Sequence, residues 1–159
     1  SVGSAFHVRT RRHEVSDRAA LIFNLDSFGS WLGWNDLILN GPVELEEYAR
    51  PFFETRDLYV KVLREIVPYA DHFPFVAAGV PGVTLLRSNC SAGRFFHHRS
   101  DDDLSRISFD VVGGLLDALA ALVADLASRE TLPFPRSIPA REAEAVERFW
   151  IDLFGGWSG

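Results

Sequence analysis

Short runs of apolar residues along the chain predict the strands of a sheet. Residues 21–26 read Leu-Ile-Phe-Asn-Leu-Asp, a continuous run that predicts a strand buried on both faces. Residues 37–40 and 83–86 predict two more short strands, and the first of these ends at an Asn-Gly-Pro break. Residues 59–67 alternate weakly between apolar and polar, which is typical of an edge strand.

Other segments carry apolar residues at helical spacing. Residues 42–58 predict a helix that Pro51 kinks or splits, and residues 73–78 predict a short helix that Asp71 can cap. Ser108 opens the longest predicted helix. Its predicted buried stripe consists of Val112, Leu115, Leu116, Leu119, Leu122, Val123 and Leu126. Strands that alternate with helices imply an α/β sandwich.

Both ends of the chain add shorter or separate elements. Residues 4–12 predict a short helix, and residues 14–18 predict a polar turn before the first strand. At the other end, a Pro-rich connector at 131–139 leads to a helix over 140–154. We expect a main domain over 1–130 and a segment over 131–159 whose helix packs on that domain or on a second subunit, which would make a homo-oligomer.

Composition restricts the classes of partner. The 159 residues suit one domain, and 47% of them are hydrophobic, which is ample for a core. The net charge of −6 disfavours nucleic acid and anionic membranes as partners, and no apolar run predicts a membrane span. The single cysteine, Cys90, excludes an internal disulfide and a zinc site built from cysteines. The chain contains no methionine and begins with Ser1, so we expect a portion of a longer protein.

Two polar positions suggest a metal site. Asp26 ends the first predicted strand, where a carboxylate usually faces a ligand crevice, and His98 stands just before the acidic run 101–103. Carboxylate oxygen and imidazole nitrogen are ligands that zinc prefers in catalytic sites. The alternatives are a strand-end carboxylate that caps a backbone turn for Asp26 and a solvated loop histidine for His98. The acidic run either orients the ligand histidine or favours the following helix start.

Three ordered motifs carry a resemblance to a known family. They are the strand ending Asn-Leu-Asp at Asp26, the sequence Tyr-Ala-Asp-His-Phe-Pro-Phe at 69–75, and His98 followed by Leu104 and Ile107. Over about residues 1–128 the chain resembles the zinc aminopeptidase family that includes glutaminyl cyclases and glutamate carboxypeptidases. The resemblance implies a three-layer sandwich with a mixed, mostly parallel central sheet flanked by helices.

The resemblance also implies roles for single residues. Asp26 and His98 correspond to ligands of a pair of zinc ions, and His98 rather than His97 has the family's spacing to Leu104. Asp71 corresponds to a carboxylate that assists proton transfer or supports the site through hydrogen bonds. The remaining candidates for the substrate pocket are His97, His72 and Phe73.

The sequence departs from the family pattern in three ways. Ala70 and Arg99 stand where the family usually has Ser or Asp and Thr or Ser. The family's further His, bridging Asp and Glu-Glu pair, whose first Glu is the general base, have no counterpart here. Residues 3–6 resemble the segment that follows that pair, so we expect the missing N-terminal portion of the same protein to supply it.

The predicted activity is that of a metal-dependent exopeptidase of the aminopeptidase type, which cleaves a peptide substrate with zinc-activated water. We expect the isolated chain to be inactive because its base is absent. One alternative is a glutaminyl cyclase-like acyltransferase on the same scaffold. Another is a non-catalytic homologue used for binding or dimerisation.

Overall fold

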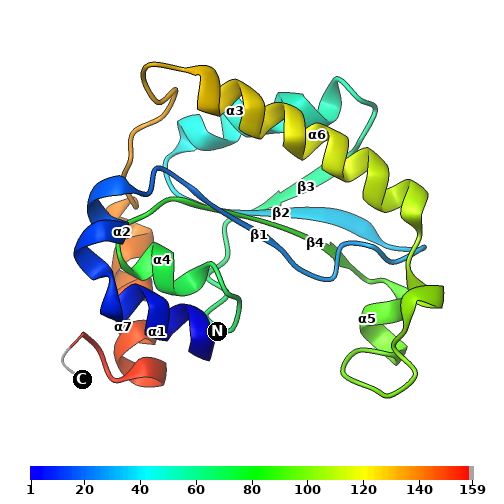
Figure 1. Ribbon diagram of the computed structural model, residues 1–159, viewed down its shortest axis with the longest axis horizontal. Helices are drawn as coiled ribbons and strands as arrows, with labels where there is room; N and C mark the ends of the chain where they lie inside the picture. The colour runs from blue at the N-terminus through cyan, green and yellow to red at the C-terminus, as the bar shows by residue number, and fades with distance from the viewer. Residues whose placement is uncertain (158–159) are drawn as a thin grey trace.

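The structure is a computed structural model that describes residues 1–157, without the side chain of residue 92. A four-stranded sheet lies between two layers of helices (Figure 1). The strands are β1 (Ile22–Leu25), β2 (Trp34–Asn40), β3 (Val60–Leu63) and β4 (Gly82–Ser88), in the spatial order β1-β4-β2-β3. Strand β1 is parallel to β4, and β2 is parallel to β3, whereas β2 and β4 are antiparallel. The predicted mixed, mostly parallel sheet is therefore confirmed.

The helices cover both faces of this sheet, as the predicted three-layer sandwich requires. On one face lie α3 (Val43–Glu54) and α6 (Phe109–Ser128). The other face carries α1 (Val2–Thr10), α2 (Arg12–Arg18), α4 (Phe73–Ala77) and α7 (Ala140–Phe154). The short α5 (Ser91–Phe95) and the single 3-10 turn η1 (Leu104–Arg106) lie between β4 and α6 in the chain. They lie near the end of the sheet at which β1 and β4 finish (Figure 1).

Two apolar clusters hold the layers together. The larger lies between the sheet and α3 and α6, and its most buried large members are Leu37, Leu39, Leu45, Phe53, Leu85, Leu115 and Leu122. The smaller joins α1, α4 and α7 through Ala5, Phe73, Val76, Val146 and Trp150. Helix α7 therefore packs on α4 within the same chain. The division of the chain at residue 130 stays a prediction.

Helix α6 presents one apolar face to the larger cluster. Its buried residues are Leu115, Ala118, Leu119 and Leu122. Leu116 and Val123, which we expected in the same stripe, are 38% and 41% exposed, because they lie on the flank of the helix rather than on its buried face. By length and hydropathy alone α6 would be able to cross a membrane, but a core helix passes the same test, and α6 contributes to this core.

The structure corrects four predictions about local structure. Residues 12–18 form α2 rather than a polar turn, and its buried Val15 packs the helix onto the domain. Strand β2 begins at Trp34 rather than at residue 37. Strand β1 lies at the sheet edge and is only half-buried, because a single strand pairs with it in the described chain. Asp71 makes no capping hydrogen bond to α4, whose N-cap position is His72.

The cap of α6 gives a first testable prediction. The Ser108 hydroxyl accepts a hydrogen bond of 3.3 Å from the Val111 backbone N–H, and Ser108 is buried. Ser108→Ala should therefore lower the free energy of unfolding by about 1 kcal/mol, measured by chemical denaturation. Ser100→Ala, at an exposed loop position, is the matched control and should change it little. Equal effects of the two substitutions would show that the cap does not contribute.

Candidate functional site

Asp26 stands where β1 leaves the sheet. Its backbone N–H still donates to the Leu85 carbonyl at 3.1 Å, so pairing with β4 continues up to this residue. Ser27 then adopts a left-handed φ of 49°, which turns the chain away from the strand direction. The Asp26 side chain is exposed and accepts a hydrogen bond of 3.2 Å from the Ser27 hydroxyl. The strand thus presents an accessible carboxylate at the end of the sheet.

His97 and His98 lie in a turn that follows α5. The Arg99 backbone N–H donates to the Phe96 carbonyl at 2.9 Å and closes this turn, in which His98 has a left-handed φ of 59°. The two imidazole rings stack with their centroids 3.8 Å apart, and both residues are exposed. The local backbone therefore places both rings together, whereas we expected only one of them to face a metal.

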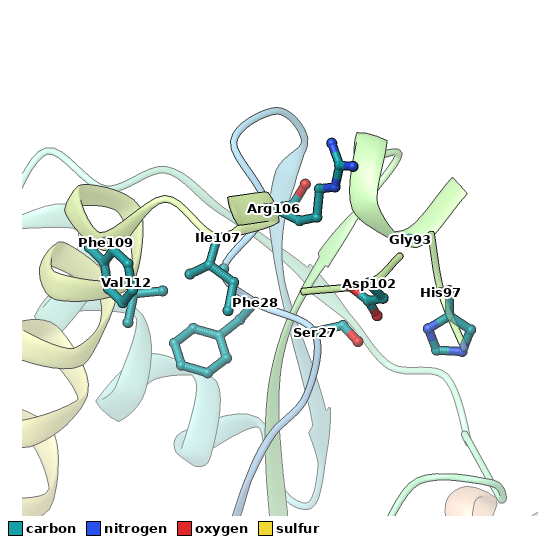
Figure 2. Close-up of a pocket in the computed structure, with 11 residues that line it drawn as sticks. Ser27, Phe28, Gly93, His97, Asp102, Arg106, Ile107, Phe109 and Val112 are labelled. Atoms are coloured by element: carbon teal, nitrogen blue, oxygen red, sulfur yellow. The ribbon is translucent and has the colours of Figure 1, made fainter. Parts of the chain in front are cut away.

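A cavity of about 370 Å³ lies between the loops at this end of the sheet. It is lined by Ser27, Phe28, Gly29, Ser30, Gly93, His97, Asp102, Arg106, Ile107, Phe109 and Val112. Figure 2 shows Asp102 between Ser27 and His97 on one side of the cavity, with Phe28, Ile107, Phe109 and Val112 grouped on the side of α6. Ser27 follows Asp26 and His97 precedes His98. The segments that carry the two predicted zinc ligands therefore meet at one cavity.

The acidic run 101–103 divides between two roles. Asp101 forms an ion pair with Arg99 at 3.0 Å, and Asp103 accepts hydrogen bonds from the backbone and hydroxyl of Ser105 at 2.8 and 2.6 Å. The bonds from Ser105 hold the pKa of the Asp103 carboxyl below its usual range. Asp103 thus caps the η1 turn. Asp102 instead lines the cavity.

Asp71 lies before α4 and is bound to the first helix. One carboxylate oxygen accepts a hydrogen bond of 2.8 Å from the Ser4 hydroxyl. The side chain is 66% exposed, so solvent weakens this contact. The geometry makes Asp71 an acceptor that joins α1 to the start of α4.

His72 and Phe73, which we expected in the substrate pocket, are instead buried. The His72 Nε2 atom lies 3.1 Å from the Asn40 amide oxygen, and its Nδ1 atom lies 2.8 Å from the Thr84 hydroxyl. Because an amide oxygen only accepts, Nε2 carries the proton and Nδ1 accepts from Thr84. Burial lowers the pKa of His72 to about 4. Phe73 packs against Trp150 in the smaller cluster, so neither residue reaches the cavity.

Comparison with known proteins assigns the chain to a family. The model of peptidase family M28 matches residues 1–123, which is more than half of the chain. The chain belongs to peptidase family M28. No curated protein matches it. The aminopeptidase from Aneurinibacillus sp. strain AM-1 has a similar structure, with a TM-score of 0.59 and 20% identity. That match covers 78% of this chain and 30% of the aminopeptidase, so the chain spans about 30% of that protein's length.

These comparisons confirm the predicted family and fold. At 20% identity the structural likeness shows the fold alone. Peptidases of family M28 are generally zinc-dependent. Within residues 1–157, no group of three or more His, Cys, Asp or Glu side chains is placed to hold a metal ion. Asp26 and His98 are donors of the right type for zinc, but they make an incomplete ligand set.

The sequence of this M28 chain did not predict several of the cavity residues. Ile107 was named only for its spacing in the family motif, and Val112 was named only as part of the apolar stripe of a helix. Both line the cavity because Ser30 and Ile107 form an isolated antiparallel bridge and the Ser108 N–H donates to the Gly29 carbonyl at 2.8 Å. The sequence carries only a weak indication that Phe28 and Gly29 line the cavity, namely that they lie two and three residues after Asp26 at the end of the strand. Nothing in the local pattern showed that they would meet the start of α6.

Proposed function

We propose that the protein is a metal-dependent exopeptidase of the aminopeptidase type, and that Asp26 and His98 contribute to its zinc site. The observation that carries this proposal is the cavity to which Ser27 and His97, the sequence neighbours of these two residues, both contribute. Membership of peptidase family M28 supports the hydrolysis of peptide bonds. The accessible side chains of Asp26 and His98 fit metal binding in their exposure and their donor chemistry.

The zinc site of the proposed enzyme needs residues from outside this chain. When bound, zinc polarises a substrate carbonyl and lowers the pKa of a water molecule. The remaining ligands and the general base would come from the N-terminal portion of the same protein, upstream of Ser1. This part of the proposal is supported by the incomplete set of donors among the described residues and by the fraction of the related aminopeptidase that the chain spans.

The chain's own residues would bind and orient the peptide. His97 and Asp102 provide polar groups on one side of the cavity, and the α6 side provides an apolar surface. Asp71 accepts a hydrogen bond from the Ser4 hydroxyl at 2.8 Å. Its exposed carboxylate would support the site through hydrogen bonds.

Two adjacent histidines allow a matched test of this function. In a protein extended upstream of Ser1, we expect zinc-dependent cleavage of a leucine anilide that a chelator abolishes. His98→Ala should lower both zinc affinity, measured by calorimetry, and kcat/KM by about a hundredfold. His97→Ala, which removes the ring stacked on His98, should leave zinc affinity within about threefold.

Brisk chelator-sensitive cleavage by residues 1–159 alone would overturn the need for upstream ligands. Unchanged zinc binding by His98→Ala would overturn the assignment of His98 as a zinc ligand.

A glutaminyl cyclase-like acyltransferase or a non-catalytic homologue would give different results in the same experiment. A glutamine-initiated peptide would lose ammonia and form a ring in the first case, without consumption of water. In the second case the extended protein would bind a peptide but cleave neither substrate. Hydrolysis of the anilide separates the proposed exopeptidase from both.

A further inference from the structure

Helix α6 is apolar on its outer side as well as on its buried side. Only 22% of an 18-residue apolar window of this helix is buried, and α6 lies in the outer layer of the molecule beside α3 (Figure 1). A second apolar line, which we call the outer stripe, follows the helix at alternating spacings of three and four residues, which places its members on one face. The outer stripe consists of Gly113, Leu116, Ala120, Val123 and Ala127. Leu116 and Val123 are 38% and 41% exposed, so the stripe is not part of the core.

The outer stripe has the relief that a second helix packs against. Small residues at 113, 120 and 127 alternate with the larger Leu116 and Val123. A Cβ atom added at Gly113 would meet nothing within 4 Å, so the helix is open on this side. Small residues let the axis of a packed helix approach to about 8 Å, and the larger residues fit between the side chains of that helix. Because α6 has 20 residues and is therefore about 30 Å long, a helix of similar length matches the stripe.

The layer that carries the outer stripe is strongly acidic. Together α3 and α6 contain seven acidic residues and one basic residue, so their net charge of −6 equals that of the whole chain. The basic residues near α6 are engaged: Arg50 pairs with glutamates of its own helix, and Arg129 pairs with Asp125 at 2.7 Å. Asp110 and Asp117 lie seven residues apart on one flank of the outer stripe, and no described side chain pairs with either. Two carboxylates beside an apolar stripe favour a cationic partner.

We propose that the outer stripe of α6 is the docking surface for an amphipathic helix of a partner protein, whose apolar face is flanked by Lys or Arg residues that pair with Asp110 and Asp117. Charge decides against the other occupants. A second copy of this chain would bring the aspartates of two α6 helices together, because α6 has no basic residue. An anionic bilayer would repel the same aspartates. The docking surface does not depend on the peptidase function.

Two designed peptides test this surface. Each spans about three heptads with Leu at the a and d positions, and one carries Lys at the e and g positions where the other carries Glu. Binding of each labelled peptide to residues 1–159 is measured by fluorescence anisotropy. The Lys peptide should bind about tenfold more tightly than the Glu peptide, and its affinity should fall as the salt concentration rises. Equal affinities of the two peptides, or no binding of the Lys peptide, would overturn the proposal.

Matched variants separate the stripe from the charge. Ala120→Gln leaves the charge unchanged, places an amide in the middle of the outer stripe, and should weaken binding of the Lys peptide about tenfold. Ala143→Gln, at an exposed alanine of α7, is the control and should stay within about twofold. Asp110→Asn combined with Asp117→Asn should remove most of the preference for the Lys peptide. Equal effects of Ala120→Gln and Ala143→Gln would contradict the role of the stripe, and an unchanged preference in the double variant would contradict the role of the aspartates.

Three further measurements decide between the possible occupants. Ala120→Gln should not change the sedimentation of residues 1–159, and a dimer that this substitution dissociates would assign the stripe to a second copy. Vesicles of phosphatidylcholine and phosphatidylserine should not bind residues 1–159, and binding that Ala120→Gln abolishes would assign the stripe to a membrane surface. A protein extended upstream of Ser1 should still bind the Lys peptide, and loss of that binding would assign the stripe to a contact within the same protein. Each of these contrary results would overturn the docking of a partner helix.

Discussion

Trp150→Ala is expected to lower the free energy of unfolding by about 4 kcal/mol. Trp150 on α7 is 1% exposed, and its ring lies 4.9 Å from that of Phe154 and 4.6 Å from that of Trp157, measured between centroids. The Arg9 guanidinium from α1 lies 5.1 Å from the centroid of the same ring. Truncation removes this packing and leaves a cavity between three helices. Urea denaturation followed by circular dichroism measures the loss.

The neighbouring residue on α7 provides the control for this substitution. Ile151 is 55% exposed, so Ile151→Ala should change the free energy of unfolding by about 0.5 kcal/mol or less. A comparably small effect of Trp150→Ala would show that α7 contributes little to the stability of the domain. The comparison is informative because α7 lies beyond residues 1–123, the part of the chain that the family model matches.

Acidification from pH 6.5 to pH 4 is expected to cost about 3 kcal/mol of stability through His72 alone. Burial lowers the pKa of His72 from 6.5 to about 4, against the smaller opposing effects of the charges on Asp71 and Asp26. Between these two values the unfolded chain binds a proton at this residue and the folded chain does not. Stability from this group is therefore complete above pH 6.5 and falls as the pH drops toward 4. Denaturation midpoints across this range measure the slope.

A variant that cannot titrate isolates this effect from that of the carboxylates. His72→Gln keeps an amide that can contact Asn40 and Thr84, and its stability should depend much less on pH between 6.5 and 4. An unchanged pH slope in His72→Gln would show that the buried imidazole is not the cause.

Elements of the fold that depend on interactions between residues close in sequence could be predicted, and those that depend on distant residues could not. The helix predicted over 140–154 has the bounds that the structure gives to α7, because its apolar spacing and the preceding Pro-rich connector are local signals. Strand β1 was predicted, but it is half-buried rather than buried on both faces. Its burial depends on how many strands pair with it, and the run 21–26 does not encode that number. The helix at 12–18 was missed because its one buried residue, Val15, makes too weak a periodic pattern.

For the candidate site, the motifs predicted which segments lie near one another, but not which side chains are in contact. The resemblance named Asp26 and His98, and the structure brings their segments to one cavity; metal binding by either residue stays a prediction. His72 was expected near the substrate because it adjoins Asp71 in the motif. It lies in the interior because its two hydrogen-bond partners, Asn40 and Thr84, come from β2 and β4. Contacts that three distant segments make together cannot be read from one of them.

The strand order has a consequence for how the molecule folds. The partner of β1 is β4, which begins only at Gly82, while β2 and β3 form in between. Loop closure over such a separation is entropically unfavourable before other contacts exist, so we expect the β2–β3 pair with α3 to assemble first and β1 to join late. The same order leaves the end of β1, and with it the carboxylate of Asp26, on one of the two edge strands of the described sheet, where local opening has fewer contacts to break. A bound ion at that residue would then slow local opening, and ligand binding and the last step of folding would be coupled at one strand.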